Sequence, residues 1–274
     1  MSMSKTRARK PVERVSERSV PDGGRPVHWD TWNLEGLDAE ARIRAGKSWE
    51  ARMKQEHLAV GAFAMLVTEL AAEGCDPIVL SLLTRASSDE VRHAEICRKM
   101  AVGLLGEDQV PKRVRGIPSI PKHPGASSET RALLHVVEMC CLSETFTGVF
   151  LTDMLSEMEE GTPRMAVESL LEDEIDHGRV GWAYLATRAR AKRVDGLAAA
   201  LPAMVEHTMG WVVDKARSHP EPDTKPLRSV GYLGSTTAGV IFERTLRDVI
   251  LPGLETCGID LGPTLAHIAE RGWR

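Results

Sequence analysis

The sequence predicts an all-α fold: a four-helix bundle with a long crossover between its second and third helices and additional helices at the C-terminus. Apolar residues make up 42% of the 274 residues and aromatic residues only 4%, while the abundant alanine, leucine, methionine and glutamate favour helices. Long segments with helical spacing of apolar residues are separated by glycine- and proline-rich breaks. Alternation of valine or isoleucine with polar residues, which would indicate strands, is rare.

The first two helices are predicted over residues 38–73 and 76–105. Gly74 ends the first helix. Asp76 followed by Pro77 begins the second, because aspartate caps a helix and proline is tolerated in its first turn. Four apolar residues keep the helical spacing of the first helix: Leu58, Ala62, Leu66 and Leu70. The short turn between the two helices predicts an antiparallel hairpin.

A long break and a second pair of helices follow. Residues 106–126 contain four prolines and three glycines, so this segment is predicted to be a loop that crosses over between two helical hairpins. The third helix is predicted over about 127–160 and the fourth from the turn at 161–163 to about 193. Beyond them the sequence predicts further helices, over about 196–217 and 235–251, and a short C-terminal piece.

Domain organisation follows from the same segments. Residues 1–27 are polar and rich in arginine and lysine, which predicts a flexible basic tail; a docking arm is the alternative. Residues 28–274 are predicted to form a single domain. Within it, the bundle core covers about 38–193 and the accessory helices cover about 196–274.

Composition narrows the class of protein further. The net charge of −4 gives no general reason to expect nucleic-acid binding, and five cysteines without a CxxC pair indicate the reduced thiols of a cytoplasmic protein. The N-terminus lacks the apolar region of a secretory signal peptide. Charge interrupts every long apolar stretch well before the ~20 residues that a membrane span needs. The sequence therefore predicts a cytoplasmic protein that binds neither nucleic acid nor membrane.

One motif with metal-binding chemistry occurs twice, as DEVRH at 89–93 and as DEIDH at 173–177. Each copy places a glutamate three positions before a histidine, which gives two pairs: Glu90 with His93, and Glu174 with His177. Residues three apart share one face of a helix, so each pair can offer one metal ion a carboxylate oxygen and an imidazole nitrogen. A single pair on a charged helix is usually a solvated face, but two such pairs together predict a metal site.

A partner for Glu90 is expected across the first hairpin, because antiparallel helices place residues equidistant from the turn at the same height. Glu90 lies as far after Gly74 as position 58 lies before it, so its partner is expected near position 58. Glu56 is the closest acidic residue to that level. Glu50 and Glu69 lie a turn or more away and rank lower.

The second hairpin passes the same test. Glu174 lies as far after Gly161 as position 148 lies before it, and Glu144 is within about one turn of that position. Glu138 is on the same helix but farther off. The separation along the chain between partner and motif glutamate is similar in both hairpins, so the two hairpins support the same ligand pattern independently.

Four carboxylates and two imidazoles suit two metal ions. Burying the carboxylates without counter-charge would be prohibitive, and two divalent cations supply about four positive charges. One imidazole per ion among carboxylates favours iron or manganese over a thiolate-preferring metal. Asp89 and Asp173 are predicted to accept the free ring N–H of the histidine on the opposite helix; exposed helix charges are the alternative. Arg92 is predicted to pair with Asp173 or Asp176.

The two motifs resemble the (D/E)ExRH signatures of ferritin-like di-iron proteins, which include bacterial multicomponent monooxygenases and acyl-carrier-protein desaturases. The runs CLSETFTG at 141–148 and EDEIDHGRVGWAYL at 172–185 are more similar to a group of bacterial ferritin-like proteins. The resemblance covers about 50–190 and implies a ferritin-like bundle that holds two iron ions, or manganese or a mixed pair, through Glu56, Glu90, His93, Glu144, Glu174 and His177. Two positions depart from the pattern: Asp176 stands where arginine is usual, and Leu170 stands where some N-oxygenating members carry a further histidine.

The resemblance leaves three functions open. The preferred one is an oxygenase or oxidase that activates O₂, acts on a small organic substrate and receives electrons from a donor protein. The 106–126 loop and the helices after residue 195 favour it, because a bare iron-oxidising bundle needs neither. The alternatives are an iron-handling ferroxidase or ferritin-like store and a non-enzymatic helical scaffold. A homodimer is a further expectation.

Candidates for a substrate pocket lie close to the predicted ligands. Gly148 would make room for a substrate, with close helix packing as the alternative, and Thr147 offers a hydroxyl near the metals. Cys97 and Cys140 each lie one turn from a ligand, where they either line the pocket or are small buried residues. His207, on the fifth predicted helix, is an outside candidate for substrate contact.

Overall fold

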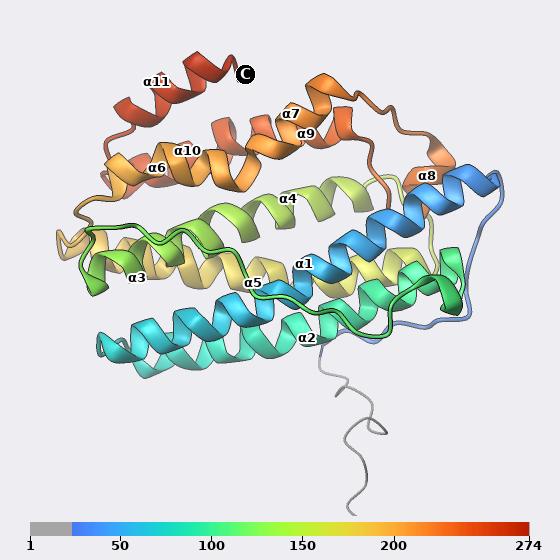
Figure 1. Ribbon diagram of the computed structural model, residues 1–274, viewed down its shortest axis with the longest axis horizontal. Coiled ribbons are helices and arrows are strands. Elements are labelled where there is room, and N and C mark those ends of the chain that lie inside the picture. Colours follow the sequence, from blue (N-terminus) through green and yellow to red (C-terminus); the bar gives the residue numbers. More distant parts are fainter. Residues whose placement is uncertain (1–23, 274) are drawn as a thin grey trace, which may run out of the picture.

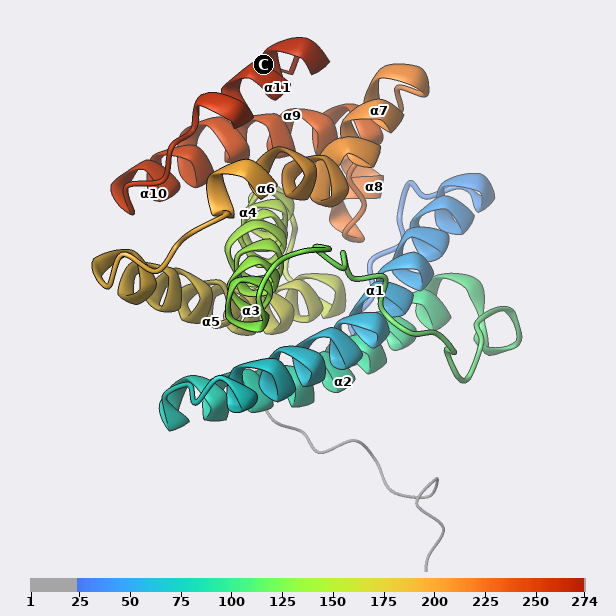
Figure 2. The same ribbon diagram turned by 60° about the vertical axis from the view of Figure 1, so that its left-hand side comes forward.

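The computed structural model describes residues 24–273 and is all-helical over that range, as the sequence predicts (Figure 1). Two long helical hairpins pack against each other, and shorter C-terminal helices cover the second hairpin (Figure 2). Most of the predicted basic tail, residues 1–23, lies outside the described residues.

Helices α1 (Ala39–Ala72) and α2 (Pro77–Leu105) form the first hairpin, with ends close to the predicted ones. Asp38 and Asp76 cap the two helices: each side chain accepts a hydrogen bond from a backbone N–H of the first turn, at 2.7 and 2.8 Å respectively. The chain reverses at Gly74, whose φ of 68° lies in the left-handed region that glycine adopts without strain.

Residues 106–126 cross over between the two hairpins as predicted, along the outside of α1 (Figure 1). The segment includes a single 3₁₀ turn, Glu107–Gln109, where the sequence predicts no helix. A small residue on α1 lets the loop approach closely. The ring of Pro118 lies over Gly61, where an added Cβ would come within 3.1 Å of the ring.

The second hairpin pairs α5 (Thr162–Arg190) with a continuous helix of three parts: α3 (Ser128–Val136), a π-helical segment (Val137–Ser143) and α4 (Glu144–Leu155). The sequence predicts a regular helix here, and the π-helical segment is a departure from it. The helix ends at Leu155 instead of about 160, because Arg164 donates hydrogen bonds to the carbonyls of Leu155 and Met158 and so satisfies the helix end. Helix α5 ends at Arg190, slightly before the predicted end at 193.

The C-terminal part of the chain lies over α4 (Figure 2). Its elements in chain order are α6 (Leu197–Val205), a π-helical segment (Glu206–Gly210), α7 (Trp211–Ser218), α8 (Lys225–Ser229), α9 (Ser235–Thr245), a further π-helical segment (Leu246–Ile250), α10 (Leu251–Thr256) and α11 (Gly262–Arg271). Both predicted helices are present, each containing a π-helical segment, and the second runs on to Thr256. Short α8 lies between the two predicted helices, and the Thr224 side chain caps it.

The ordered N-terminal segment begins before the predicted domain boundary at residue 28. Arg25 pairs with Glu168 of α5 at 3.1 Å. The backbone N–H of Thr31 donates to the hydroxyl of Thr162 at 3.1 Å. Arg25, near the end of the predicted tail, thus contacts α5.

One helix, Ser128–Leu155, is long and apolar enough to cross a membrane, although charge was expected to interrupt every such stretch. A core helix passes the same test of length and composition, and 67% of its most apolar window is buried inside the fold. The apolar character of this helix therefore matches its central position in the second hairpin.

Two apolar clusters fill the bundle on either side of its middle. Phe63 and Leu70 belong to a cluster near the Gly74 turn, whereas Trp49 and Leu170 belong to a cluster toward the other end of α1. All four side chains are fully or almost fully buried. The stretch of α1 between Trp49 and Phe63 faces a polar centre.

Candidate metal site

All six predicted ligands meet at this polar centre, and all six are buried. They form two overlapping groups in which the possible ligand atoms lie within 4.8 Å of one another: Glu56, Glu90, His93 and Glu174 in the first group, and Glu90, Glu144, Glu174 and His177 in the second. Glu90 and Glu174 belong to both groups, so they occupy the middle of the site.

Each hairpin contributes one glutamate from its first helix and a Glu-x-x-His pair from its second. The contributions are Glu56 from α1, Glu90 and His93 from α2, Glu144 from α4, and Glu174 and His177 from α5. The π-helical segment ends directly before Glu144. A π turn contains an extra residue and is frequent at functional sites, and here it sets the rotation of α4 and thus the direction of Glu144.

Both histidines turn the Nδ1 atom toward the centre. Nδ1 of His93 lies 3.5 Å from Oε2 of Glu90 and 3.4 Å from Oε1 of Glu174. Nδ1 of His177 lies 3.2 Å from Oε1 of Glu90 and 3.3 Å from Oε2 of Glu174. The two imidazoles therefore face the same pair of carboxylates, with ring centroids 5.9 Å apart.

The Nε2 atoms point to aspartates on the opposite helix. Nε2 of His93 lies 3.2 Å from Oδ2 of Asp173, and Nε2 of His177 lies 3.5 Å from Oδ2 of Asp89. The structure thus places both aspartates beside the histidines that the sequence predicts for them. The alternative of exposed charges does not hold, because the side chains of Asp89 and Asp173 are only 14% and 3% exposed. This crosswise arrangement directs both Nδ1 atoms inward.

Arg92 connects the site to the N-terminal segment. Its guanidinium pairs with Asp173, one of its two predicted partners, and donates to Oγ of Ser169 at 2.8 Å. Ser169 in turn donates to the backbone carbonyl of Arg25 at 2.9 Å. Asp176, the other predicted partner, is exposed at the surface. The residues that orient His93 are therefore held from both α5 and the chain before α1.

Protons balance part of the carboxylate charge when no metal cation is bound. Burial by itself would lower the pKa of the two imidazoles, but the adjacent carboxylates raise the pKa of His93 to about 10 and that of His177 to about 12. Burial and neighbouring carboxylates raise the pKa of Glu56 and Glu144 well above the usual value. Burial opposes the ionisation of Glu174, but the two adjacent imidazoles hold its pKa well below the usual value. The protonated imidazoles thus place positive charge beside the buried carboxylates.

Several buried polar atoms at the centre have no hydrogen-bond partner among the described residues. One is Nε2 of His177, which lies 3.5 Å from Oδ2 of Asp89. Four others face the centre: Oε2 of Glu90, Oε2 of Glu174, Nδ1 of His93 and Nδ1 of His177. Unpaired buried polar atoms are costly, and metal ions bound between them would engage all four. Carboxylate oxygens with one imidazole per group are donors that suit iron or manganese. The residues present therefore fit a pair of such ions.

A cavity of ≈ 600 Å³ borders the site. Glu56 and Glu144 form part of its wall, so each group of ligands presents one carboxylate to it. Residues 118–121 of the crossover, together with Trp211 of α7 and Phe242 of α9, complete the wall. The long loop and the C-terminal helices thus enclose a space directly beside the site.

The structure distinguishes between the alternatives for the pocket candidates. Thr147 lines the cavity. Gly148 is buried and does not line this cavity, so it does not make room for a substrate there. Close helix packing does not explain this glycine either, because no atom of another element lies within 4 Å of where its Cβ would be. Cys97 and Cys140 are fully buried in apolar clusters. They line neither this cavity nor a second cavity of ≈ 440 Å³ beside it, which agrees with their interpretation as small core residues.

Two features of the cavity wall were missed from the sequence: the pairing of His207 with Glu138, and the presence of Arg52. Nδ1 of His207, the outside candidate for substrate contact, lies 2.6 Å from Oε1 of buried Glu138, and both residues line the cavity. Arg52 also lines it, and its Nη1 lies 3.9 Å from Oε1 of Glu56. The spacing of four between Arg52 and Glu56 could have revealed the arginine, since it places both on one helix face. No local signal joins Glu138 to His207.

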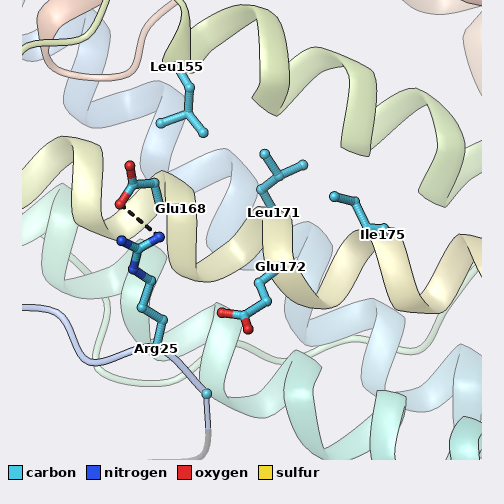
Figure 3. Close-up of a pocket in the computed structure, with 7 residues that line it drawn as sticks. Arg25, Leu155, Glu168, Leu171, Glu172 and Ile175 are labelled. Atoms are coloured by element: carbon cyan, nitrogen blue, oxygen red, sulfur yellow. Dashed lines mark ion pairs between the residues drawn. The ribbon is translucent and has the colours of Figure 1, made fainter.

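A separate surface cavity of ≈ 710 Å³ lies between α5, the end of α4 and the N-terminal segment (Figure 3). Glu168 of α5 pairs across it with Arg25. Its wall includes none of the six ligands, so it is not the space that serves the metal site.

Comparisons with known proteins give no match: no family model, no curated protein and no solved structure matches this chain. Over the described residues, the chain is an all-helical fold with buried carboxylate and imidazole groups that could bind a metal.

Proposed function

We propose that this chain is a ferritin-like di-iron protein that uses O₂ to oxidise a small organic molecule. The observation that carries the proposal is the pair of buried groups that share Glu90 and Glu174. In ferritin-like carboxylate proteins, two helices provide one glutamate each and two others provide a Glu-x-x-His pair each, all directed inward. The ligands of this chain have the same composition and the same distribution over four helices. Manganese or a mixed pair suits the same donors.

The side chains have separate parts in holding the ions. Glu56 with His93 would hold one ion and Glu144 with His177 the other, while Glu90 and Glu174, which belong to both groups, would be available to either. Asp173 lies within hydrogen-bond distance of Nε2 of His93, and Asp89 lies 3.5 Å from Nε2 of His177. Each aspartate would hold the Nε2 proton of its histidine, which would fix the tautomer and leave the Nδ1 lone pair free for a metal. When bound, a reduced iron pair supplies the electrons for the reaction with O₂.

The cavity beside the site supports an enzyme over an iron store. Its volume of ≈ 600 Å³ lies within the roughly 300–1,000 Å³ typical of small-molecule sites. A substrate in this cavity would lie against Glu56 and Glu144, and the hydroxyl of Thr147 is available to hydrogen-bond it. Oxidation of Fe²⁺ alone needs no such space. An electron-donor protein, a cytoplasmic location and a homodimer belong to the proposal as expectations.

Metal analysis after anaerobic loading with Fe²⁺ is the test. About two irons per chain are expected, and O₂ should then oxidise them once, with little further uptake of Fe²⁺. Continued oxidation of added Fe²⁺ into mineral would instead support an iron store. A folded chain that takes up no stoichiometric metal would leave the scaffold as the remaining function and would refute the proposal.

A further inference from the structure

Arg52 lies at the junction of two cavities. The cavity beside the metal site and a second cavity of ≈ 440 Å³ share five wall residues: Arg52, Gln55, Thr147, Trp211 and Phe242. The two cavities therefore adjoin, and the Arg52 side chain, which is 17% exposed, takes part in both walls. Arg52 precedes Glu56 by one turn of α1, so its charge is close to the first group of ligands.

The guanidinium of Arg52 makes no hydrogen bond to any residue of the described chain. The carboxylate that it approaches, Oε1 of Glu56, is 3.9 Å away, which is beyond hydrogen-bond distance. Its central carbon lies 5.9 Å from the ring centroid of Trp49 and 5.4 Å from that of Phe150. Such contacts orient a guanidinium and leave its five N–H donors available. A guanidinium that lines two cavities and has no acceptor at hydrogen-bond distance can receive an anionic ligand.

Two other cations in the wall of the second cavity hydrogen-bond carboxylates: Arg44 donates to Glu40 at 2.9 Å and Lys47 donates to Glu50 at 2.7 Å. Lys215 lies 3.8 Å from Glu221, which is outside hydrogen-bond distance. Among the described residues of this wall, Arg52 is the one guanidinium without a carboxylate at hydrogen-bond distance, so it can balance a ligand charge. Its planar fork matches the two oxygens of a carboxylate, whereas a dianion would bring one charge more than Arg52 can balance.

The surfaces around Arg52 are largely apolar. Both cavities include the aromatic side chains of Trp211 and Phe242. Aliphatic side chains also line both, among them Leu58 and Ile120 in the larger cavity and Val212 and Leu233 in the smaller one. Removing hydrocarbon from water against such a wall is favourable, at about 25 cal/mol per Å² of apolar surface. The ligand is therefore expected to carry an apolar body on its single anionic group.

We infer that the two cavities form a binding site for an amphipathic organic monocarboxylate, with the carboxylate on Arg52 and the apolar body in the cavity beside Glu56 and Glu144. The role of this ligand as the substrate rests on the proposed function, but its binding requires no metal. Arg52 holds the carboxylate at the cavity junction and so keeps it from competing with the protein ligands for the ions. The apolar carbons then face the metal site.

A purely electrostatic role is the competing explanation for Arg52. In that role the arginine only offsets the charge of Glu56, which it approaches to 3.9 Å. The two roles differ in what a substitution changes. A carboxylate receptor controls ligand binding even in the metal-free protein, whereas a counter-charge for Glu56 controls metal uptake alone.

The experiment is isothermal titration calorimetry of the metal-free full-length chain with octanoate, and with octan-1-ol as the uncharged probe of the same length. Arg52→Gln is expected to weaken octanoate binding about ten- to a hundredfold, because the variant loses a charged hydrogen-bonded pair. Octan-1-ol binding should change little. Lys54→Gln is the matched control, since Lys54 lies on the same helix but outside both cavity walls and is already paired with Glu50 at 2.8 Å.

Circular dichroism establishes that each variant is folded, and Arg52→Lys, which keeps the charge but not the fork, replaces Arg52→Gln if the latter does not fold. Equal octanoate affinity in the wild-type and Arg52 variants would overturn the inference. Failure of the wild-type chain to bind octanoate at millimolar concentration would overturn it as well. Iron analysis of the same preparations separates the two proposals: octanoate binding through Arg52 in a chain that takes up no iron would support this site and refute only the di-iron oxidase.

Discussion

Replacing both shared glutamates, in the variant Glu90→Ala with Glu174→Ala, is expected to abolish stabilisation of the protein by divalent metal. Each of these residues belongs to both groups, so the variant leaves each group with one carboxylate and one imidazole. The metal-free variant should remain helical, because the removed carboxylates repel those of Glu56 and Glu144 and raise their pKa values. Loss of this repulsion offsets part of the lost packing.

The size of the effect follows from ligand linkage. An ion that binds only the folded state stabilises it by about 2.7 kcal/mol at a free concentration of about 100 Kd, so two ions contribute about 5 kcal/mol. Unfolding entropy is about 2.1 cal/mol/K per residue, or roughly 0.6 kcal/mol/K for a chain of 274 residues. Saturating metal should therefore raise the Tm of the wild-type protein by about 9 °C.

Thermal unfolding followed by far-ultraviolet circular dichroism, with and without Mn²⁺, measures this shift. Glu95→Ala with Glu172→Ala is the matched control, since these glutamates lie on the same two helices but outside both groups. The control should keep the metal-dependent shift of the wild-type protein, whereas the Glu90 and Glu174 variant should show almost none. An equal shift in all three proteins would refute the ligand assignment.

Four further predictions concern the residues around the site. Asp173→Asn should lower Mn²⁺ affinity about 10–100-fold, because the aspartate orients a metal-binding histidine, whereas Asp176→Asn at the surface should leave the affinity measured by calorimetry unchanged. The Tm of the metal-free protein should fall as pH rises above about 6.5, because the site histidines, with pKa values of about 10 and 12 when folded, keep protons that the unfolded chain releases; a higher Tm at pH 9 than at pH 7 would contradict this. Gly148→Ala should change the free energy of unfolding by less than about 1 kcal/mol, or increase it, because its Cβ meets no atom within 4 Å and alanine favours helix. Gly181→Ala should cost about 1–3 kcal/mol in urea unfolding, because its Cβ would collide with Cβ of Cys140.

The long helices and the meeting of the six predicted ligands could be predicted because their signals are local or depend on one geometric relation. Gly74 and Asp76 mark the turn of the first hairpin by backbone preferences that act within a few residues. The spacing of three within each Glu-x-x-His pair places both side chains on one helix face. Equal distance from a turn then identified Glu56 and Glu144, because antiparallel helices rise by the same amount per residue.

The sequence by itself thus determined the all-helical class, the two hairpins and the residues that meet at their centre. Only the tertiary structure decided what surrounds that centre. The cavity beside Glu56 and Glu144 forms because the C-terminal helices pack over α4, so that Trp211 of α7 and Arg52 of α1 line the same space. The pair of His207 with Glu138 joins residues 69 positions apart. The π-helical segment at 137–143 lies against α5, and its departure from a regular helix depends on that packing. Short-range patterns record the preferences of a few neighbouring residues, whereas these features arise from contacts that exist only once the hairpins and the C-terminal helices have packed together.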